Sequence, residues 1–238
     1  HMGDLRRRLV AMYEAMLLRF GPQHWWPARA HLAPHDRKLE ICLGALLTQN
    51  TNWGNVEKAL DRLDAAGAMR VDVLTKMPPA RLAELIRPAG YFNVKARRLK
   101  NFISHVTDHH GGCIEGLLAV PKVRLREQLL GINGIGPETA DSMILYAAGK
   151  CTFVVDAYTR RICLRHGLIA PGDGYEAIKS LFESHVPPRT GLYNDYHAQL
   201  VAVGKHFCRP AARCLGCPLE PLDHDASLPP LPPPHSRR

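Results

Sequence analysis

The stretch LLGINGIGPETADSMILYA, from Leu129 to Ala147, decides the fold. Apolar residues flank the turn GIG at positions 134–136, and Pro137 stands where a second helix would begin. The glycines permit a tight turn with close backbone approach, and the N–H groups that open the second helix form an anion site suited to a DNA phosphate. The stretch therefore predicts a helix-hairpin-helix. The residues expected to bind the phosphate are Gly134, Gly136 and Thr139.

The chain of 238 residues is basic, with 31 Lys plus Arg against 22 Asp plus Glu and a formal net charge of +9. This charge favours a polyanionic partner. No apolar run approaches the ~20 residues that a membrane-spanning helix needs, and the N-terminal residues lack the apolar core of a signal peptide. We expect a monomer in the cytoplasm, nucleoid-associated if bacterial. The basic residues expected to divide between solvent and phosphate are Lys95, Arg97, Arg98 and Lys100.

Apolar positions at helical spacing predict helices over residues 4–20, 38–48, 55–66, 79–86, 94–109, 122–130, 138–148, 157–165, 174–184 and 192–207, and strand alternation is nearly absent. The one ambiguous run is CTFVV, residues 151–155. Proline and glycine pairs separate the periodic segments, so the pattern predicts an all-α fold. The expected parts are a six-helix domain over residues 37–150, a helical domain from residues 1–36 and 151–226 with a DNA-binding cleft between the two, and a Pro-rich tail over residues 227–238.

The hairpin is followed by FVVDAYTRRI, in which Asp156 stands between an apolar run and a new helix. This order resembles the helix-hairpin-helix DNA glycosylases of the endonuclease III superfamily. LGALLTQNTNWGNVEKAL (Leu43–Leu60) and GYFNVKARRLKNF (Gly90–Phe102) resemble further family segments, so the resemblance covers nearly the whole chain. It implies a base excision repair enzyme that binds double-stranded DNA with a damaged base or an abasic site. It also implies that Gln49 wedges into the duplex where the base is flipped out.

The chemistry of this family explains why a carboxylate is needed at Asp156. Breaking an N-glycosidic bond develops positive charge on the deoxyribose, which a carboxylate can stabilise while it or another group activates water. Asp156 is therefore the expected catalytic residue. The structural alternative is an ordinary N-cap of the helix that begins at Ala157.

Glu138 marks a departure from the family members that also cut the DNA strand. In those members a lysine at this position forms a Schiff base with the sugar. A carboxylate cannot form that imine, so the chain is expected to be monofunctional, with water as the nucleophile and no AP lyase activity. A second possibility is a noncatalytic module that only binds DNA lesions.

Trp25 and Trp26 stand together in the loop sequence QHWWP. Such a pair either packs in the protein or forms a stacking wall for a flipped base. With the later HAQLVAVGK stretch, QHWWP makes the chain resemble the 3-methyladenine glycosylase branch, because indoles can hold a cationic methylated purine by cation–π stacking. The alternative is an endonuclease III-type glycosylase for oxidised pyrimidines with weak or lost lyase activity.

Cys208, Cys214 and Cys217 form the pattern C-x5-C-x2-C, which in a reducing compartment favours a metal site over disulfides. The segment resembles the iron–sulfur loop of the family, with Asp223 near the place of a fourth cysteine. The resemblance implies a 4Fe–4S cluster held by the three cysteines and Asp223. Three alternatives remain: His206 or His224 as the fourth ligand, zinc in a Cys3His site, or three free thiols.

Overall fold

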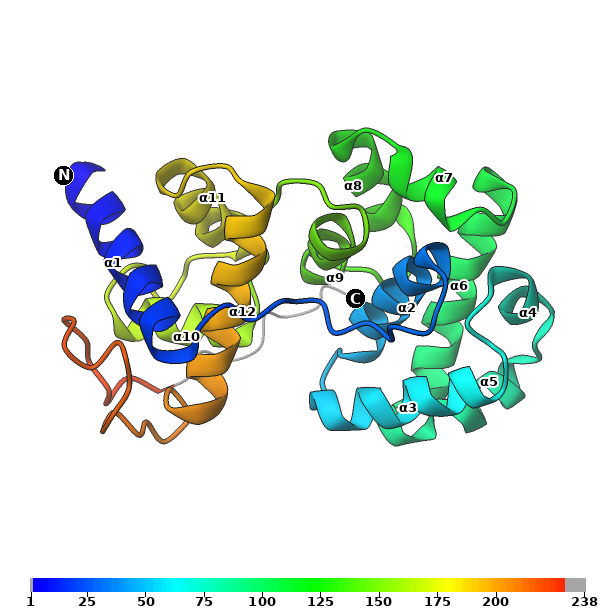
Figure 1. Ribbon diagram of the computed structural model, residues 1–238, viewed down its shortest axis with the longest axis horizontal. Coiled ribbons are helices and arrows are strands. Elements are labelled where there is room, and N and C mark those ends of the chain that lie inside the picture. The colour runs from blue at the N-terminus through cyan, green and yellow to red at the C-terminus, as the bar shows by residue number, and fades with distance from the viewer. Residues whose placement is uncertain (1, 230–238) are drawn as a thin grey trace. The chain divides into compact units, whose positions relative to one another are not determined.

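The computed structural model describes residues 2–229, and these residues form helices and irregular segments without a strand (Figure 1). The all-α prediction is confirmed. None of the described helices is long and apolar enough to cross a membrane. From Pro230 onward, the predicted Pro-rich tail lies outside the described residues. The α-helices are α1 (Met2–Phe20), α2 (Pro34–Leu47), α3 (Trp53–Ala65), α4 (Val71–Lys76), α5 (Pro79–Leu85), α6 (Phe92–His110), α7 (Ile114–Ala119), α8 (Lys122–Gly131), α9 (Pro137–Ser142), α10 (Ala157–Arg165), α11 (Tyr175–His185) and α12 (Thr190–His206).

The chain folds into two compact units. Among the described residues, unit 1 consists of residues 2–25 and 151–229, and unit 2 of residues 26–150. The chain therefore passes from one unit to the other between Trp25 and Trp26 and returns after Lys150. The sequence analysis placed the first of these boundaries at residue 37.

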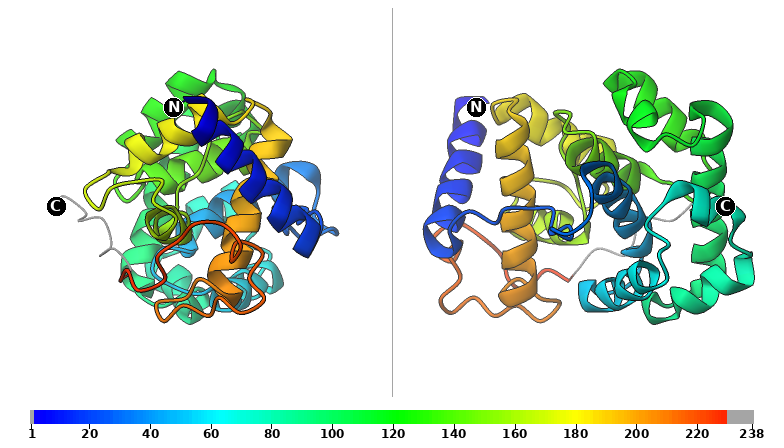
Figure 2. Two further views of the ribbon diagram at one scale, coloured as in Figure 1. Left: turned by 90° about the vertical axis from the view of Figure 1, so that its left-hand side faces the viewer. Right: turned by 45° about the vertical axis from the view of Figure 1, so that its right-hand side comes forward.

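Unit 2 contains α2 to α9, arranged around α6, which packs against α2, α4, α5 and α7 (Figure 2). The side of α6 that faces these helices buries Leu99, Phe102 and Ile103 completely or nearly so. Two helices, α4 and α7, were not expected. Each has six residues, which is fewer than two turns, so neither repeats an apolar position often enough to show a helical period.

A buried ion pair joins the two helices of the hairpin in unit 2. Arg126 of α8 donates to both carboxylate oxygens of Asp141 of α9, at 2.9 and 3.2 Å. The Asp141 side chain is fully buried. After Ser142 the chain continues through a π-helical turn at Met143–Ala147, where one continuous helix was expected. Because α8 carries one partner of the bidentate pair and α9 the other, the pair restrains the angle between the two helices of the hairpin.

Unit 1 is built on α12, which packs against α10 and α1. The approach to α10 is close: a Cβ added at Gly204 would overlap the ring of Tyr158. The run 151–155 is irregular rather than a strand, and it is buried because Phe153 stacks on Phe182 with ring centres 4.1 Å apart. The Tyr196 hydroxyl donates to the Leu9 carbonyl at 2.8 Å, which ties α12 to α1.

Candidate functional site

Asp156 follows the buried run and opens α10. Its Oδ1 accepts hydrogen bonds from the backbone N–H of Thr159 at 2.7 Å and from the Thr159 hydroxyl at 2.9 Å. Asp156 is therefore the N-cap of α10. The capping role predicted as an alternative is present, and it leaves the second oxygen, Oδ2, for another partner.

His197 of α12 faces that second oxygen. Its Nε2 lies 3.3 Å from Asp156 Oδ2, and the two side chains are 6% and 13% exposed. Burial raises the pKa of Asp156, but the close approach of His197 and the hydrogen bonds from Thr159 lower it more, so the pKa lies below its usual value. The carboxylate is thus ionised at neutral pH although it is almost buried. Sequence reasoning quoted the stretch that contains His197 without singling out this residue.

Trp25 lies against the same helix. The side-chain amide of Asn194 donates to the Trp25 carbonyl at 2.8 Å. The indole meets the His197 ring edge-on, with ring centres 6.0 Å apart and an interplanar angle of 84°. Lys205 Nζ stands 6.0 Å from the centre of the same indole. Unit 1 therefore brings Trp25, His197 and Asp156 into one contiguous group.

Trp26 has its contacts in unit 2. Its ring meets that of Trp53 edge-on at 5.2 Å and that of Tyr146 at 5.3 Å. The two tryptophans that the sequence treats as one pair thus belong to different units. Trp25 contacts the residue that faces Asp156, whereas Trp26 packs against apolar rings of the hairpin unit.

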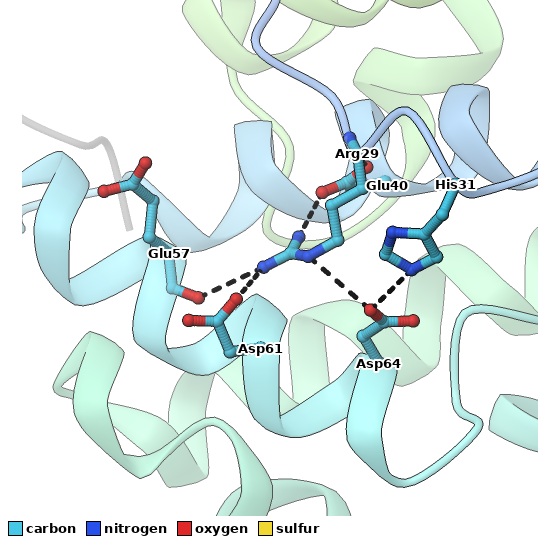
Figure 3. Close-up of polar contacts among 6 residues, drawn as sticks. All are labelled: Arg29, His31, Glu40, Glu57, Asp61 and Asp64. Carbon is cyan, nitrogen blue, oxygen red and sulfur yellow. Dashed lines mark hydrogen bonds and ion pairs between the residues drawn. The ribbon is translucent and has the colours of Figure 1, made fainter.

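An ionic cluster fixes the irregular segment that follows Trp26 (Figure 3). The guanidinium of Arg29 pairs with Glu40 of α2 and with Asp61 and Asp64 of α3. The Arg29 backbone N–H also donates to Glu40 Oε2 at 2.8 Å, and the Glu40 side chain is only 1% exposed. Burial lowers the pKa of Arg29, but the carboxylates raise it more, so the pKa lies above its usual value. The cluster attaches the segment to two helices and thereby limits the freedom of Trp26.

The two glycines of the hairpin differ in how strictly they are needed. Gly134 has a φ of +100°, and a Cβ there would overlap the side chain of Arg98. Gly136 has a φ of −96°, acts as the N-cap of α9 and has open space around it. The turn therefore requires glycine at position 134. At position 136 the negative φ is one that any residue can adopt, so a side chain is tolerated there.

Gln49 is bound to the hairpin. Its Nε2 donates to the Gly134 carbonyl at 3.1 Å and to the Thr139 hydroxyl at 2.9 Å. Its Oε1 accepts from Arg98. The structure therefore brings together three of the residues predicted to bind DNA, and it adds Arg98, which the sequence could not separate from the other basic residues of α6.

The basic residues of α6 do different things. Lys95 is buried, and its ammonium donates to the carbonyls of Leu47 at 2.8 Å and Ala89 at 2.7 Å. Burial and the charge of Arg98 lower the pKa of Lys95 to about 8. Lys100 donates to three carbonyls at the end of α4. Of the four, Arg97 alone is exposed to solvent, so most of the charge on this helix serves the fold.

Glu138 and Tyr91 are both exposed in unit 2. Glu138 lies in the first turn of α9, where a negative charge interacts favourably with the helix N-terminus. Tyr91 is 71% exposed and has a φ of +45°, just before α6. Sequence reasoning missed Tyr91, and its only signal was the preceding breaker, Gly90. An exposed aromatic side chain in a left-handed conformation is uncommon.

The three clustered cysteines line one pocket in unit 1. His224 lines the same pocket, whereas Asp223 and His206 do not. Arg165 donates to Cys208 Sγ at 3.3 Å and to the carbonyls of residues 209 and 210, and Figure 2 shows the loop beside α12. Burial and the neighbouring cysteines raise the pKa of Cys217. Among residues 2–229, no group of three or more Cys, His, Asp or Glu side chains is arranged to hold a metal ion.

Comparisons with known proteins agree with this architecture. The family described as "HhH-GPD superfamily base excision DNA repair protein" matches residues 43–188. The chain is 41% identical to MJ1434 of Methanocaldococcus jannaschii, named as a candidate DNA repair glycosylase, over 89% of this chain and 94% of that protein.

Two solved structures are similar in fold. One is the H. pylori 3-methyladenine DNA glycosylase MagIII bound to 1,N6-ethenoadenine, with a TM-score of 0.70, 29% identity and coverage of 84% of this chain and 97% of that chain. The other is a trapped endonuclease III–DNA covalent intermediate, with a TM-score of 0.74 and 21% identity over 90% of this chain and 93% of that chain. At that identity the second likeness shows the fold alone.

Proposed function

The chain belongs to the HhH-GPD superfamily of base excision DNA repair proteins, and we propose that it is a monofunctional DNA glycosylase that excises a damaged base. The observation that carries the proposal is Asp156, an almost buried carboxylate whose pKa is lowered by His197 and Thr159. Departure of the base leaves positive charge on the deoxyribose. An ionised carboxylate in a weakly solvated site stabilises that charge and favours attack by water.

The proposed partner is duplex DNA that contains a damaged base or an abasic site. The hairpin supports this proposal, because α9 opens at Gly136, which is exposed and has open space around it. Removal of a base from a duplex requires that the base be extruded and that its place be filled. Gln49, beside the hairpin, and the exposed ring of Tyr91 are the side chains suited to fill it.

The proposal that base release occurs without strand cleavage rests on Glu138. It occupies the start of α9 with a carboxylate, which forms no imine with the sugar. The expected result is release of free base without covalent protein–DNA product after borohydride treatment. Efficient trapping by borohydride contradicts this part of the proposal. Glu138→Lys restores an amine at this position, and any trapping that appears in this variant alone supports the assignment.

For the substrate we propose an alkylated purine. The support is the indole of Trp25 beside His197, and a similar solved structure is that of a 3-methyladenine glycosylase bound to 1,N6-ethenoadenine. Lys205 already places a cation over the same indole. A second cation on that ring is unfavourable, so an uncharged alkylated purine fits this surface better than a cationic one.

The experiment that tests the function is a product assay on duplexes that each carry one lesion: 3-methyladenine, 1,N6-ethenoadenine, or an oxidised pyrimidine. We expect release of an alkylated purine, weakened by Trp25→Ala. Excision of an oxidised pyrimidine alone favours an endonuclease III-type glycosylase without lyase activity. Tight binding to abasic DNA with no release from any lesion favours a noncatalytic module.

For the C-terminal loop we propose a 4Fe–4S cluster held by Cys208, Cys214 and Cys217. The support is the chemistry of the donors: the three thiols line one pocket and Arg165 offers positive charge to the first of them, although within residues 2–229 these side chains are not arranged around a metal ion. The pocket favours His224 over Asp223 as the fourth ligand. Its Nδ1 donates to the Leu222 carbonyl at 2.8 Å, which places the lone pair on Nε2.

Purification under anaerobic conditions tests the cluster. We expect brown protein with absorbance near ~400 nm and bound iron. His224→Ala should lower the iron content, while Asp223→Ala should leave it unchanged. Zinc without iron indicates a Cys3His zinc site, and the absence of metal from anaerobic protein contradicts the proposal.

A further inference from the structure

We propose that His197 is a positioning residue for Asp156: it holds the carboxylate in a single orientation and ionised, and it couples that orientation to Trp25. The proposal rests on the function proposed above, because it assumes that Asp156 acts on the sugar. His197 is not assigned to touch substrate. Its action passes through the carboxylate that it faces.

The geometry gives each oxygen of Asp156 its own partner. Oδ1 accepts both bonds from Thr159 of its own helix. Oδ2 lies 3.3 Å from Nε2 of His197, which comes from α12. A carboxylate held at one oxygen can still tilt through combined rotations about its Cα–Cβ and Cβ–Cγ bonds, whereas partners from two different helices define its plane. The close packing of α10 on α12 at Gly204 keeps those partners at a constant distance.

The electrostatic surroundings make His197 the decisive partner. The other titratable groups that interact with Asp156 are Tyr158 and Cys163 of α10, and burial together with the Asp156 charge raises the pKa of both. Neither side chain can carry a positive charge, whereas the interaction with His197 lowers the pKa of Asp156. Removal of His197 therefore leaves burial opposed by Thr159 alone, and burial favours the protonated acid.

The contact with Trp25 extends this arrangement to the surface where the base is proposed to stack. The His197 ring meets the indole edge-on, and Asn194, one turn earlier on α12, holds the Trp25 carbonyl. One face of α12 therefore positions both the carboxylate and the aromatic ring. A change in His197 alters the two together.

Three variants test the proposal: His197→Ala, which removes the partner; His197→Gln, which keeps an N–H donor without an ionisable ring; and His185→Gln on α11 as the matched control. His185 binds the Leu181 carbonyl of its own helix and lies outside the proposed machinery. The first readout is single-turnover base release against pH. We expect a loss of roughly 10- to 100-fold at neutral pH in His197→Ala, as for a misplaced catalytic group, with an acid limb shifted to higher pH.

The second readout, the melting temperature against pH, does not depend on catalysis. The folded-state pKa of Asp156 is lowered, so its ionisation stabilises the fold above the unfolded pKa, and this stabilisation is lost as the pH falls through the folded value. The melting-temperature difference between His197→Ala and the unmodified protein should thus be large near pH 5 to 6 and shrink below about pH 4. His197→Gln should recover part of both effects.

The outcomes separate this inference from the function on which it rests. A melting-temperature difference that is constant with pH, or His197→Gln no better than His197→Ala, overturns the positioning role even if base is released. The pH-dependent difference without base release from any lesion preserves the contact between His197 and Asp156 and overturns the proposed function. Equal effects in His185→Gln show a general cost of removing histidine and also overturn the inference.

Discussion

Asp156 in unit 1 and Gln49 in unit 2 are both held by partners within the protein, but the partners differ in what they do for the side chain. Both side chains are assigned to work on DNA, and both have protein partners in this structure. Asp156 is almost buried, and its partners support the charged form that the chemistry needs. Gln49 is half-buried and bonds to the hairpin itself.

The difference shows which group is preorganised and which must move. Asp156 keeps its partners while it acts, because a carboxylate stabilises charge best when it does not reorient. In the proposed role as a wedge, Gln49 would have to release Gly134 and Thr139 before it enters a duplex. Those hydrogen bonds are exchanged for new ones rather than simply lost, so the cost of the exchange is small.

Asp156→Asn should produce the largest effect, because it removes the charge and keeps the shape. Asn is as good an N-cap as Asp, so α10 should keep its start, and the only stability lost should be that of the ionised Asp156 carboxylate. Base release should fall by about 10²- to 10³-fold or more. Affinity for lesion DNA should stay equal or increase, since a negative charge near phosphates is lost. Single-turnover kinetics measure base release, and fluorescence anisotropy measures the affinity for DNA. Retention of most of the base-release activity refutes the catalytic assignment.

Arg126→Met should destabilise the hairpin unit most. It leaves the fully buried Asp141 without its bidentate partner, at a cost of about 3 to 5 kcal/mol of unfolding free energy. Arg126→Met with Asp141→Asn should recover part of that loss. The control is Arg124→Met, whose exposed pair with Glu127 should contribute less than about 0.5 kcal/mol. Denaturant unfolding measures all three, and equal effects of Arg126→Met and Arg124→Met contradict the role given to the buried pair.

Gly134→Ala should cost about 1 to 3 kcal/mol and weaken DNA binding, because the left-handed backbone and the Arg98 side chain both exclude a Cβ. Gly131→Ala, at the end of α8 with open space around it, is the matched control and should be neutral or slightly stabilising. A variant of Gly134 that binds DNA like the unmodified protein argues against contact between the turn and phosphate.

Gln49→Ala should have a small effect on stability, about 1 kcal/mol, since it removes two neutral hydrogen bonds and one from Arg98 at a half-buried site. Its effect should appear instead in lesion recognition: the substitution should weaken binding to abasic duplex several-fold more than it weakens binding to undamaged duplex. Anisotropy titrations with the two duplexes measure this ratio. An unchanged ratio removes Gln49 as the wedge and leaves Tyr91 as the exposed candidate.

Local sequence patterns predicted much of the architecture. Helical periodicity and proline–glycine breakers located the longer helices, and the hairpin with its glycines identified the family. Periodicity failed where the element was too short, at α4 and α7, and where the helix widened at residues 143–147. The run at 151–155 was ambiguous because a buried irregular segment and a buried strand are equally apolar.

Residues of the same type could not be distinguished from the sequence, and the tertiary structure showed that they have different surroundings. Trp25 and Trp26 look equivalent in the chain, yet each contacts a different unit. Gly134 and Gly136 look equivalent in the turn, yet one has a positive φ. The basic residues of α6 have one charge each, and burial decides which of those charges remains available to a polyanion.

By itself the sequence determined the all-α class, the superfamily, the hairpin and the position of Asp156, because these depend on spacing between near neighbours. Only the tertiary structure decided that His197, Thr159 and Trp25 surround that carboxylate, that Gln49 lies on the hairpin, and that His224 shares the cysteine pocket. Those groupings depend on which helices pack together. Contacts between residues far apart in the chain follow from the burial of many side chains at once, and no short motif records them.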